Sequence, residues 1–90
     1  MNLNQLRHLI ALAEHHSFSK AAEALFLTQP ALSRSIQALE QDLDVRLVDR
    51  DGKRTTLTAY GELVAARAER ILFEARELKR GVELLKEGQL

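Results

Sequence analysis

The first stretch of the chain places apolar residues at the spacing of an amphipathic helix. The positions that share one face are Leu3, Leu6, Leu9, Ile10 and Ala13. This period predicts a helix from about Leu3 to His15. Asn2, followed three residues later by Gln5, is typical of a capping box at the start of such a helix.

A second, shorter helix is predicted after the segment HSFS, which interrupts the first pattern. Ser19 is a residue type that caps helix N-termini, so we expect this helix from Lys20 to about Leu25. Its buried stripe would be Phe18, Ala22 and Leu25.

The segment from Phe26 to Leu43 predicts a third helix with two very different faces. Thr28 can cap it, and Pro30 is tolerated in a first turn because its missing N–H would have no intrahelical partner there. The apolar seam is Leu32, Ile36, Leu39 and Leu43. The polar side carries Gln29, Pro30, Ser33, Arg34, Gln37 and Gln41. Only FLT separates this helix from the second, which is typical of a helix-turn-helix.

A change to a two-residue period follows in VRLVDRDGKRTTL. Asp51-Gly52 is a dipeptide that two-residue hairpin turns prefer. We therefore expect strands at about Leu47–Arg50 and Lys53–Leu57. Arg50, Lys53 and Arg54 would ring the tip of this hairpin.

A long final helix is predicted from the cap residue Thr58 to Glu87, on the order of 45 Å at about 1.5 Å per residue. Its heptad seam is Val64, Ala68, Ile71, Ala75, Leu78, Val82 and Leu85. We expect Leu63 and Val64 to join the core of the domain. The part from Leu78 to Leu85 extends past so small a body, and an identical helix is its simplest partner.

Composition limits the classes of function without choosing one. The 90 residues suit one small, mainly helical domain, and 13 basic residues balance 13 acidic ones. The chain has no cysteine, signal-peptide pattern or apolar run long enough for a membrane span, which fits a cytoplasmic location. Neutral charge favours a helical adaptor that binds other proteins, whereas nucleic-acid binders are usually basic.

The local charge distribution favours nucleic acid instead. Between Thr28 and Leu39 the only charged residue is Arg34, and Arg50 to Leu57 holds three basic residues and one acid. Gln can pair with adenine and Arg with guanine in the major groove, where nearby carboxylates would be repelled by phosphates. The alternative is a solvated helix face and an ordinary basic turn. The short turn, Pro30 and the basic hairpin together favour a DNA-reading helix with a wing on the backbone or in the minor groove.

Metal binding and catalysis find no support in the residue pattern. His15 and His16 are adjacent and point about 100° apart on a helix, and H-E-x-x-H is missing. Ser17 and Ser19 near the histidines have no third group to orient them, and no Gly-rich phosphate loop occurs. We expect neither an enzyme nor a metal site, and no cofactor in this domain.

Three segments resemble the N-terminal domain of LysR-type bacterial transcriptional regulators: FSKAAEALFLTQPALSRSIQALEQDL, RLVDR and TLTAYG. The resemblance implies a winged helix-turn-helix domain over residues 1–58, with the helix-turn-helix at 18–37, and a linker helix over 59–90. It implies DNA contacts from Thr28, Gln29, Pro30, Ser33, Arg34, Gln37, Arg50, Lys53 and Arg54. Asp44 stands where the family usually has Gly, and Asp tolerates the left-handed turn. Tyr60 stands where Ala is usual, and its bulk would tilt the linker helix or meet the partner subunit.

The same resemblance implies partners and a missing part. Linker helices of this family pair antiparallel, so the expected state is a homodimer, and a tetramer for the full-length protein. The expected target is double-stranded DNA with an interrupted inverted repeat and T/A-rich flanks, and RNA polymerase is a further expected partner. A C-terminal domain that binds a small-molecule effector would follow the linker helix.

Overall fold

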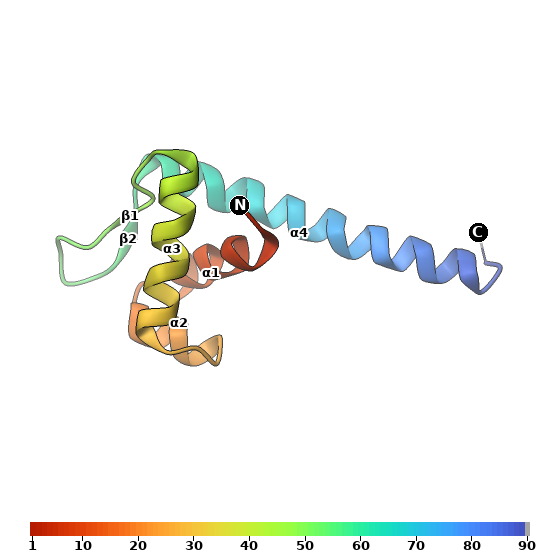
Figure 1. Cartoon of the computed structure of the whole chain (residues 1–90), viewed down its shortest axis with the longest axis horizontal. Coiled ribbons are helices and arrows are strands. Elements are labelled where there is room, and N and C mark those ends of the chain that lie inside the picture. The colour runs from red at the N-terminus through yellow and green to blue at the C-terminus, as the bar shows by residue number, and fades with distance from the viewer. Residues whose placement is uncertain (90) are drawn as a thin grey trace.

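Four helices and a two-stranded hairpin make up residues 1–89, which the computed structural model describes; Leu90, the last residue of the predicted linker segment, lies outside them. The helices are α1 (Leu3–His15), α2 (Phe18–Ala24), α3 (Gln29–Leu43) and α4 (Ala59–Lys86). The strands are β1 (Val48–Asp49) and β2 (Thr56–Leu57). The first three helices form a body beside which the hairpin projects, and α4 runs past this body as a rod (Figure 1). The predicted mainly helical, winged helix-turn-helix fold is confirmed.

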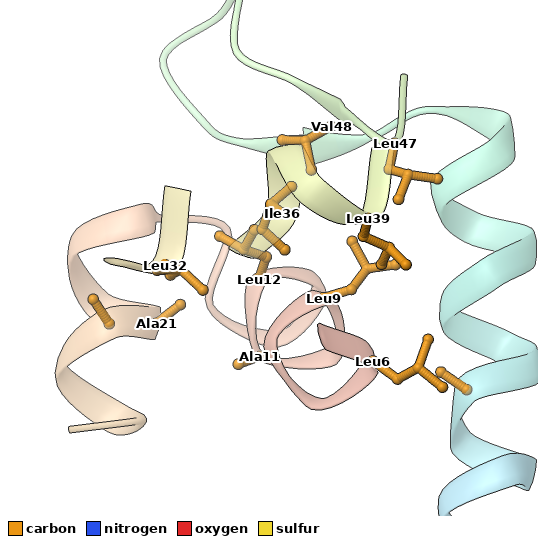
Figure 2. Packing of buried hydrophobic residues seen from close by; sticks show 12 residues of the cluster. Leu6, Leu9, Ala11, Leu12, Ala21, Leu32, Ile36, Leu39, Leu47 and Val48 are labelled. Atoms are coloured by element: carbon orange, nitrogen blue, oxygen red, sulfur yellow. The ribbon is translucent and has the colours of Figure 1, made fainter. Parts of the chain in front are cut away.

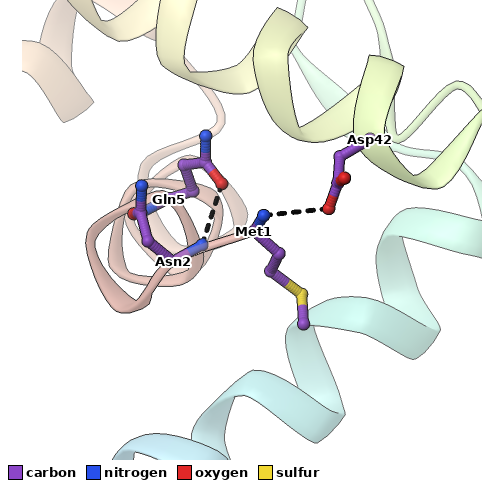
Figure 3. Close-up of polar contacts among 4 residues, drawn as sticks. All are labelled: Met1, Asn2, Gln5 and Asp42. Carbon is purple, nitrogen blue, oxygen red and sulfur yellow. Dashed lines mark hydrogen bonds and ion pairs between the residues drawn. The ribbon is translucent and has the colours of Figure 1, made fainter.

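The start of α1 is fixed by the predicted capping box (Figure 3). The Asn2 side chain accepts a hydrogen bond from the backbone N–H of Gln5 at 2.9 Å, and the Gln5 side chain accepts one from Asn2 at 3.0 Å. The α-amino group of Met1 lies 2.9 Å from the Asp42 carboxylate of α3. The first residues of the chain therefore tie α1 to the C-terminal half of α3.

The second helix begins earlier than predicted. Ser17, not Ser19, is the N-cap, because its hydroxyl accepts from the backbone N–H of Lys20 at 3.1 Å. Phe18 and Ser19 consequently lie in the first turn, and Ala24 ends the helix. Phe26 in the connection to α3 has a left-handed backbone, with φ of 58°.

The core lies where α1, α2, α3, the hairpin and the first half of α4 meet (Figure 2). Its fully buried large side chains are Leu6, Leu9, Leu12, Leu32, Ile36, Leu39, Leu47 and Val48. Ala21 and Ala22 of α2 are also buried, and their small side chains allow neighbouring helices to approach closely. The predicted apolar seam of α3 is confirmed at Leu32, Ile36 and Leu39, whereas Leu43 at the end of the helix is half-buried.

The hairpin is shorter than predicted, and the prediction of a two-residue turn at Asp51-Gly52 is wrong. Val48 pairs with Leu57 and Asp49 with Thr56, so the loop runs over residues 50–55. The Asp49 carboxylate accepts from the N–H of Asp51 at 3.0 Å and turns the chain early. The N–H of Thr55 donates to the carbonyl of His16, at the end of α1, at 3.1 Å. Because Thr55 is bonded to α1 instead of the opposite strand, the ladder ends there.

The long helix α4 matches the predicted one within a residue at each end. The Thr58 hydroxyl caps it by accepting from Gly61 N–H at 3.1 Å. Only its first half packs against the body, where Gly61, Ala68 and Leu72 are buried. Leu63 is 60% exposed, so its predicted place in the core is wrong, whereas Val64 packs against the core as expected. None of the helices in residues 1–89 is long and apolar enough to cross a membrane.

Candidate nucleic-acid interface

The third helix is held by one face and exposes the other. Opposite its buried leucines and isoleucine, Gln29, Pro30, Arg34 and Gln37 are exposed and Ser33 is half-buried. Thr28 is exposed too, but its hydroxyl also caps the helix by accepting from Ala31 N–H at 3.2 Å. The structure thus brings the six predicted reading residues together along the N-terminal half of α3.

No acidic residue lies in the first turn of α3, so its free N–H groups and positive helix end face solvent without a competing carboxylate. The two acids of this helix are in its C-terminal half, and both have donors within the domain. The Glu40 carboxylate accepts from the N–H groups of Leu47 and Val48 at 2.8 and 3.3 Å. Asp42 pairs with the α-amino group of Met1. The acids of α3 therefore hold the fold together, while its other half is free of negative charge.

The wing divides the three predicted basic residues into two groups. Lys53 and Arg54 are exposed in the loop after β1. Arg50 does not ring the tip with them, because its guanidinium lies 4.2 Å from the centre of the Phe18 ring. The same guanidinium reaches the hydroxyl of Ser33 at 3.5 Å, the outer limit of a hydrogen bond. Arg50 therefore links the base of the wing to the first turn of α2 and to the polar face of α3.

Sequence reasoning missed two features of this surface. Phe18 was predicted only as a buried stripe residue, but its ring also supports Arg50. Arg46 is exposed and lines a shallow surface hollow with Gln37 and Gln41 of α3. No local pattern indicates the Phe18–Arg50 contact or the position of Arg46 beside α3, because both depend on how the hairpin folds back against the helices.

A polar contact between α1 and α3 lies behind the exposed face. The Nδ1 atom of His8 is 2.6 Å from the hydroxyl of Ser35. Burial lowers the pKa of His8 from its usual 6.5, and the positive charge of Arg7 lowers it further. Neutral imidazole is thus favoured, and His8 serves as a structural link between the helices.

The predicted seam of α4 is only partly open to a partner. Ile71, Leu78, Val82 and Leu85 are exposed by 40, 68, 46 and 64%. Ala68 is fully buried against the body of the same chain, so its predicted place in a dimer seam is wrong. Val64 and Ala75 are half-buried. Tyr60 and Leu63, which the predicted seam omitted, are 57 and 60% exposed.

These features define a class of protein: a winged helix-turn-helix domain with a long C-terminal helix. Residues 3–62 match the family described as bacterial regulatory helix-turn-helix protein, lysR family. The match covers most of the chain, and the chain belongs to this family.

Relatives and solved structures agree with this assignment. The chain is 55% identical over 84 residues, 93% of its length, to an SDS degradation transcriptional activation protein of a Pseudomonas species. It is 45% identical over 87 residues, 97% of its length, to a probable RuBisCO transcriptional regulator of a Nostoc species. The aligned parts span only 28 and 26% of those two proteins.

Several of the similar structures contain DNA. The BenM DNA-binding domain in complex with catB site 1 DNA superimposes with a TM-score of 0.95 at 32% identity, covering 100% of this chain and 97% of that one. Vibrio fischeri DarR in complex with DNA gives a TM-score of 0.92 at 32% identity, covering 97% of this chain and 30% of that one. Both the hairpin and the long helix therefore have counterparts in relatives solved with DNA.

Proposed function

We propose that this chain is the sequence-specific DNA-binding domain of a bacterial LysR-type transcriptional regulator. The observation that carries the proposal is the exposed, acid-free N-terminal half of α3 beside a basic wing. A helix of this kind fits the major groove, where amide and guanidinium groups can pair with base edges. Similarity to two structures solved with DNA supports the same conclusion.

Within this proposal the side chains divide by role. Gln29 and Arg34 are exposed on the first turns of α3 and would read base edges, with Pro30, Ser33 and Gln37 beside them. The hydroxyl of Thr28 and the free N–H groups of the first turn would meet a phosphate. Lys53 and Arg54 would lie on the backbone or in the minor groove.

Arg50 has a different role in the proposal, because it is already engaged by Phe18 and Ser33. It would hold the wing at a fixed angle to α3, so that the two elements meet adjacent grooves together. Removing it would then weaken binding to the specific site more than binding to random DNA. A simple phosphate contact, which the expected place of the wing on the backbone would suggest for Arg50, would instead weaken both about equally when lost.

The dimer and the rest of the protein belong to the proposal as well. The exposed part of α4 would pair two domains on an interrupted inverted repeat with T/A-rich flanks. Because the chain spans about a quarter of the length of the two relatives described above, a C-terminal effector-binding domain is proposed for the whole protein. Membership in the family is the basis on which we also propose tetramer formation, contact with RNA polymerase and a cytoplasmic location for the whole protein.

Selection of bound duplexes from a random pool, followed by titration against the enriched site, tests the DNA-binding role. Gln29→Ala should weaken the enriched site by about 5- to 150-fold and relax the preference at one base pair. Gln41→Ala is the matched control, since it removes the same side chain about three turns further along α3 and should change binding little. Affinity should fall steeply as salt rises, because phosphate contacts release counterions.

The adaptor alternative rests on the neutral total charge. It predicts a pool without enriched sequences and no salt-dependent duplex binding. That outcome would replace the DNA-binding proposal with a protein-binding one.

A further inference from the structure

An apolar stripe on α4 faces away from the domain's own core. We define the α4 stripe as Tyr60, Leu63, Ile71, Leu78, Val82 and Leu85, each at least 40% exposed. These residues share one side of the helix, next to the side on which Gly61, Ala68 and Leu72 are buried. The α4 stripe covers about 38 Å of helix at about 1.5 Å per residue. Such a length of exposed apolar surface is typical of a helix that pairs with another helix.

Beside the middle of this stripe lies a strip of four charged residues in a definite order. Arg67 and Arg70 come first, and Glu74 and Glu77 follow, with Leu72 at the midpoint. Their spacing of three, four and three residues places them along one side of α4. The ion pairs found within residues 1–89 are Met1–Asp42 and Lys86–Glu83, so none of the four is paired in the single chain.

The order of these charges distinguishes the two ways in which identical helices can pair. In a parallel pair in register, the two-fold axis runs along the helices and places the charged strips of the two copies on opposite sides of the apolar seam, so the four residues do not face one another. In an antiparallel pair centred near Leu72, Arg70 lies opposite Glu74 of the second copy. Arg67 then lies opposite Glu77 of the second copy, and the two-fold axis repeats both contacts. The charge order therefore attracts in the antiparallel arrangement and contributes no contact in the parallel one.

Four of the six residues of the α4 stripe have nearly the same centre as the charges. In the antiparallel arrangement Tyr60 lies near Leu85 of the second copy, and Leu63 near Val82 of the second copy. Both pairs are centred between Leu72 and Phe73, within half a residue of the centre of the charges, so the ends of the α4 stripe and the charged strip favour one register together. Two independent patterns on one helix thus point to the same occupant, a second copy of this chain.

We propose that Arg67, Arg70, Glu74 and Glu77 restrict the pairing of α4 to chains with the same charge order. The inference rests on the proposed function only in taking α4 as the pairing helix. A related regulator with the reverse charge order would place like charges opposite all four positions, and such contacts disfavour a mixed dimer. The four residues are thus partner-selecting residues, and the α4 stripe supplies the affinity.

Two charge-reversed variants test this selection by analytical ultracentrifugation. An acidic variant carries Arg67→Glu with Arg70→Glu, and a basic variant carries Glu74→Arg with Glu77→Arg. Each alone should self-associate at least tenfold more weakly than the unaltered chain, because four attractions become four repulsions. An equimolar mixture should recover the original affinity as a heterodimer. The matched control reverses Glu69 and Arg76, which lie on another side of α4, and should dimerise normally.

Cysteine cross-linking tests the orientation, because the chain has no cysteine of its own. A mixture of Leu63→Cys and Val82→Cys chains should form a mixed disulfide dimer, since these positions come close only when the helices are antiparallel. Neither variant alone should cross-link. Cross-linking of each variant with itself would instead indicate parallel pairing and overturn the proposed register.

The outcomes separate this inference from the DNA-binding proposal. Charge-reversed variants that dimerise as well as the unaltered chain, or a mixture that fails to recover affinity, overturn partner selection even if duplex binding is intact. A chain that is monomeric throughout overturns it as well. Selective pairing without any enriched duplex supports the inference and contradicts the proposed DNA-binding role.

Discussion

Gly61 in the first turn of α4 is the position at which one added methyl group should disturb the fold most. A Cβ atom there would lie 2.1 Å from the carbonyl oxygen of Leu47 and 3.0 Å from the Cβ of Leu57. Ordinary contact begins at about 3.4 Å, so α4 and Leu47, the residue before β1, would have to separate by more than 1 Å. The same Leu47 carbonyl accepts the N–H of Thr58 at 2.9 Å, just where α4 begins. Gly61→Ala should therefore move the wing and α4 apart and weaken that hydrogen bond.

The size of the effect follows from three opposing contributions. Overpacking costs about 1–3 kcal/mol, and a weakened hydrogen bond costs about 1 kcal/mol more. The better helix propensity of Ala returns about 1 kcal/mol. The net loss of unfolding free energy is then about 1–3 kcal/mol. For a domain of this size, each kcal/mol lost lowers the melting temperature by about 4–8 °C.

Gly81→Ala is the matched control on the same helix. Nothing lies within 4 Å of a Cβ built at Gly81, so only the propensity term applies and stability should rise by about 1 kcal/mol. Urea unfolding of both variants, followed by circular dichroism at one fixed protein concentration, measures the difference. A Gly61→Ala chain as stable as the unaltered one would refute the close approach of α4 to the hairpin.

Three further changes probe other contacts of the fold. Phe26 is 96% exposed, so its side chain adds little to the core, yet its backbone is left-handed, which only Gly adopts without strain. Phe26→Gly should therefore raise the unfolding free energy in urea by about 1–2 kcal/mol. Phe26→Ala is the control, because it keeps the strained conformation and should give no such gain. Because burial lowers the pKa of His8 below 6.5, its protonation opposes folding, so stability should fall as pH drops below about 6.5. His8→Asn should flatten that part of the stability-versus-pH curve. An unchanged slope would show that protonation of His8 is not its cause. Glu40→Ala should cost about 1–3 kcal/mol of unfolding free energy by leaving the N–H groups of Leu47 and Val48 without their acceptor, and Glu40→Gln should cost less.

Local patterns determine the helices of this domain well. The bounds of α1 and its capping box were predictable because Asn2, Gln5 and the apolar period act within a few residues of one another. Asp44 takes the left-handed conformation expected of it at the end of α3, with φ of 55°. The start of α2 was missed because Ser17 and Ser19 are both good caps, and only the geometry of the preceding turn selects Ser17.

The hairpin and the α4 seam depend on distant contacts that no local pattern contains. The strands end early because Thr55 donates to His16, which is 39 positions away in the chain. On α4 the apolar period identifies a seam but not which side the body occupies. The body covers Ala68 and Leu72, and this leaves Leu63 exposed for a partner.

The candidate site shows the same division. The exposed residues of α3 were predictable, because its buried leucines set which side faces outward. The position of Arg50 was not, since its guanidinium is held by Phe18 and Ser33 from two other elements. Residues that read bases can thus be found from one helix, whereas those that orient the wing require the tertiary structure.

The neutral total charge of the chain does not oppose a polyanionic ligand once the acids are placed in the fold. Residues 59–90 hold six of the thirteen acids and six of the thirteen basic residues, so residues 1–58 are neutral in total as well. Glu40 and Asp42 are engaged by backbone N–H groups and by the amino group of Met1. Electrostatic attraction to DNA depends on the charge near the contact surface, because salt screens separations beyond about 8 Å under physiological conditions. The neutral total therefore does not describe the contact surface, because the first turns of α3 carry no acid and the wing loop adds the exposed Lys53 and Arg54.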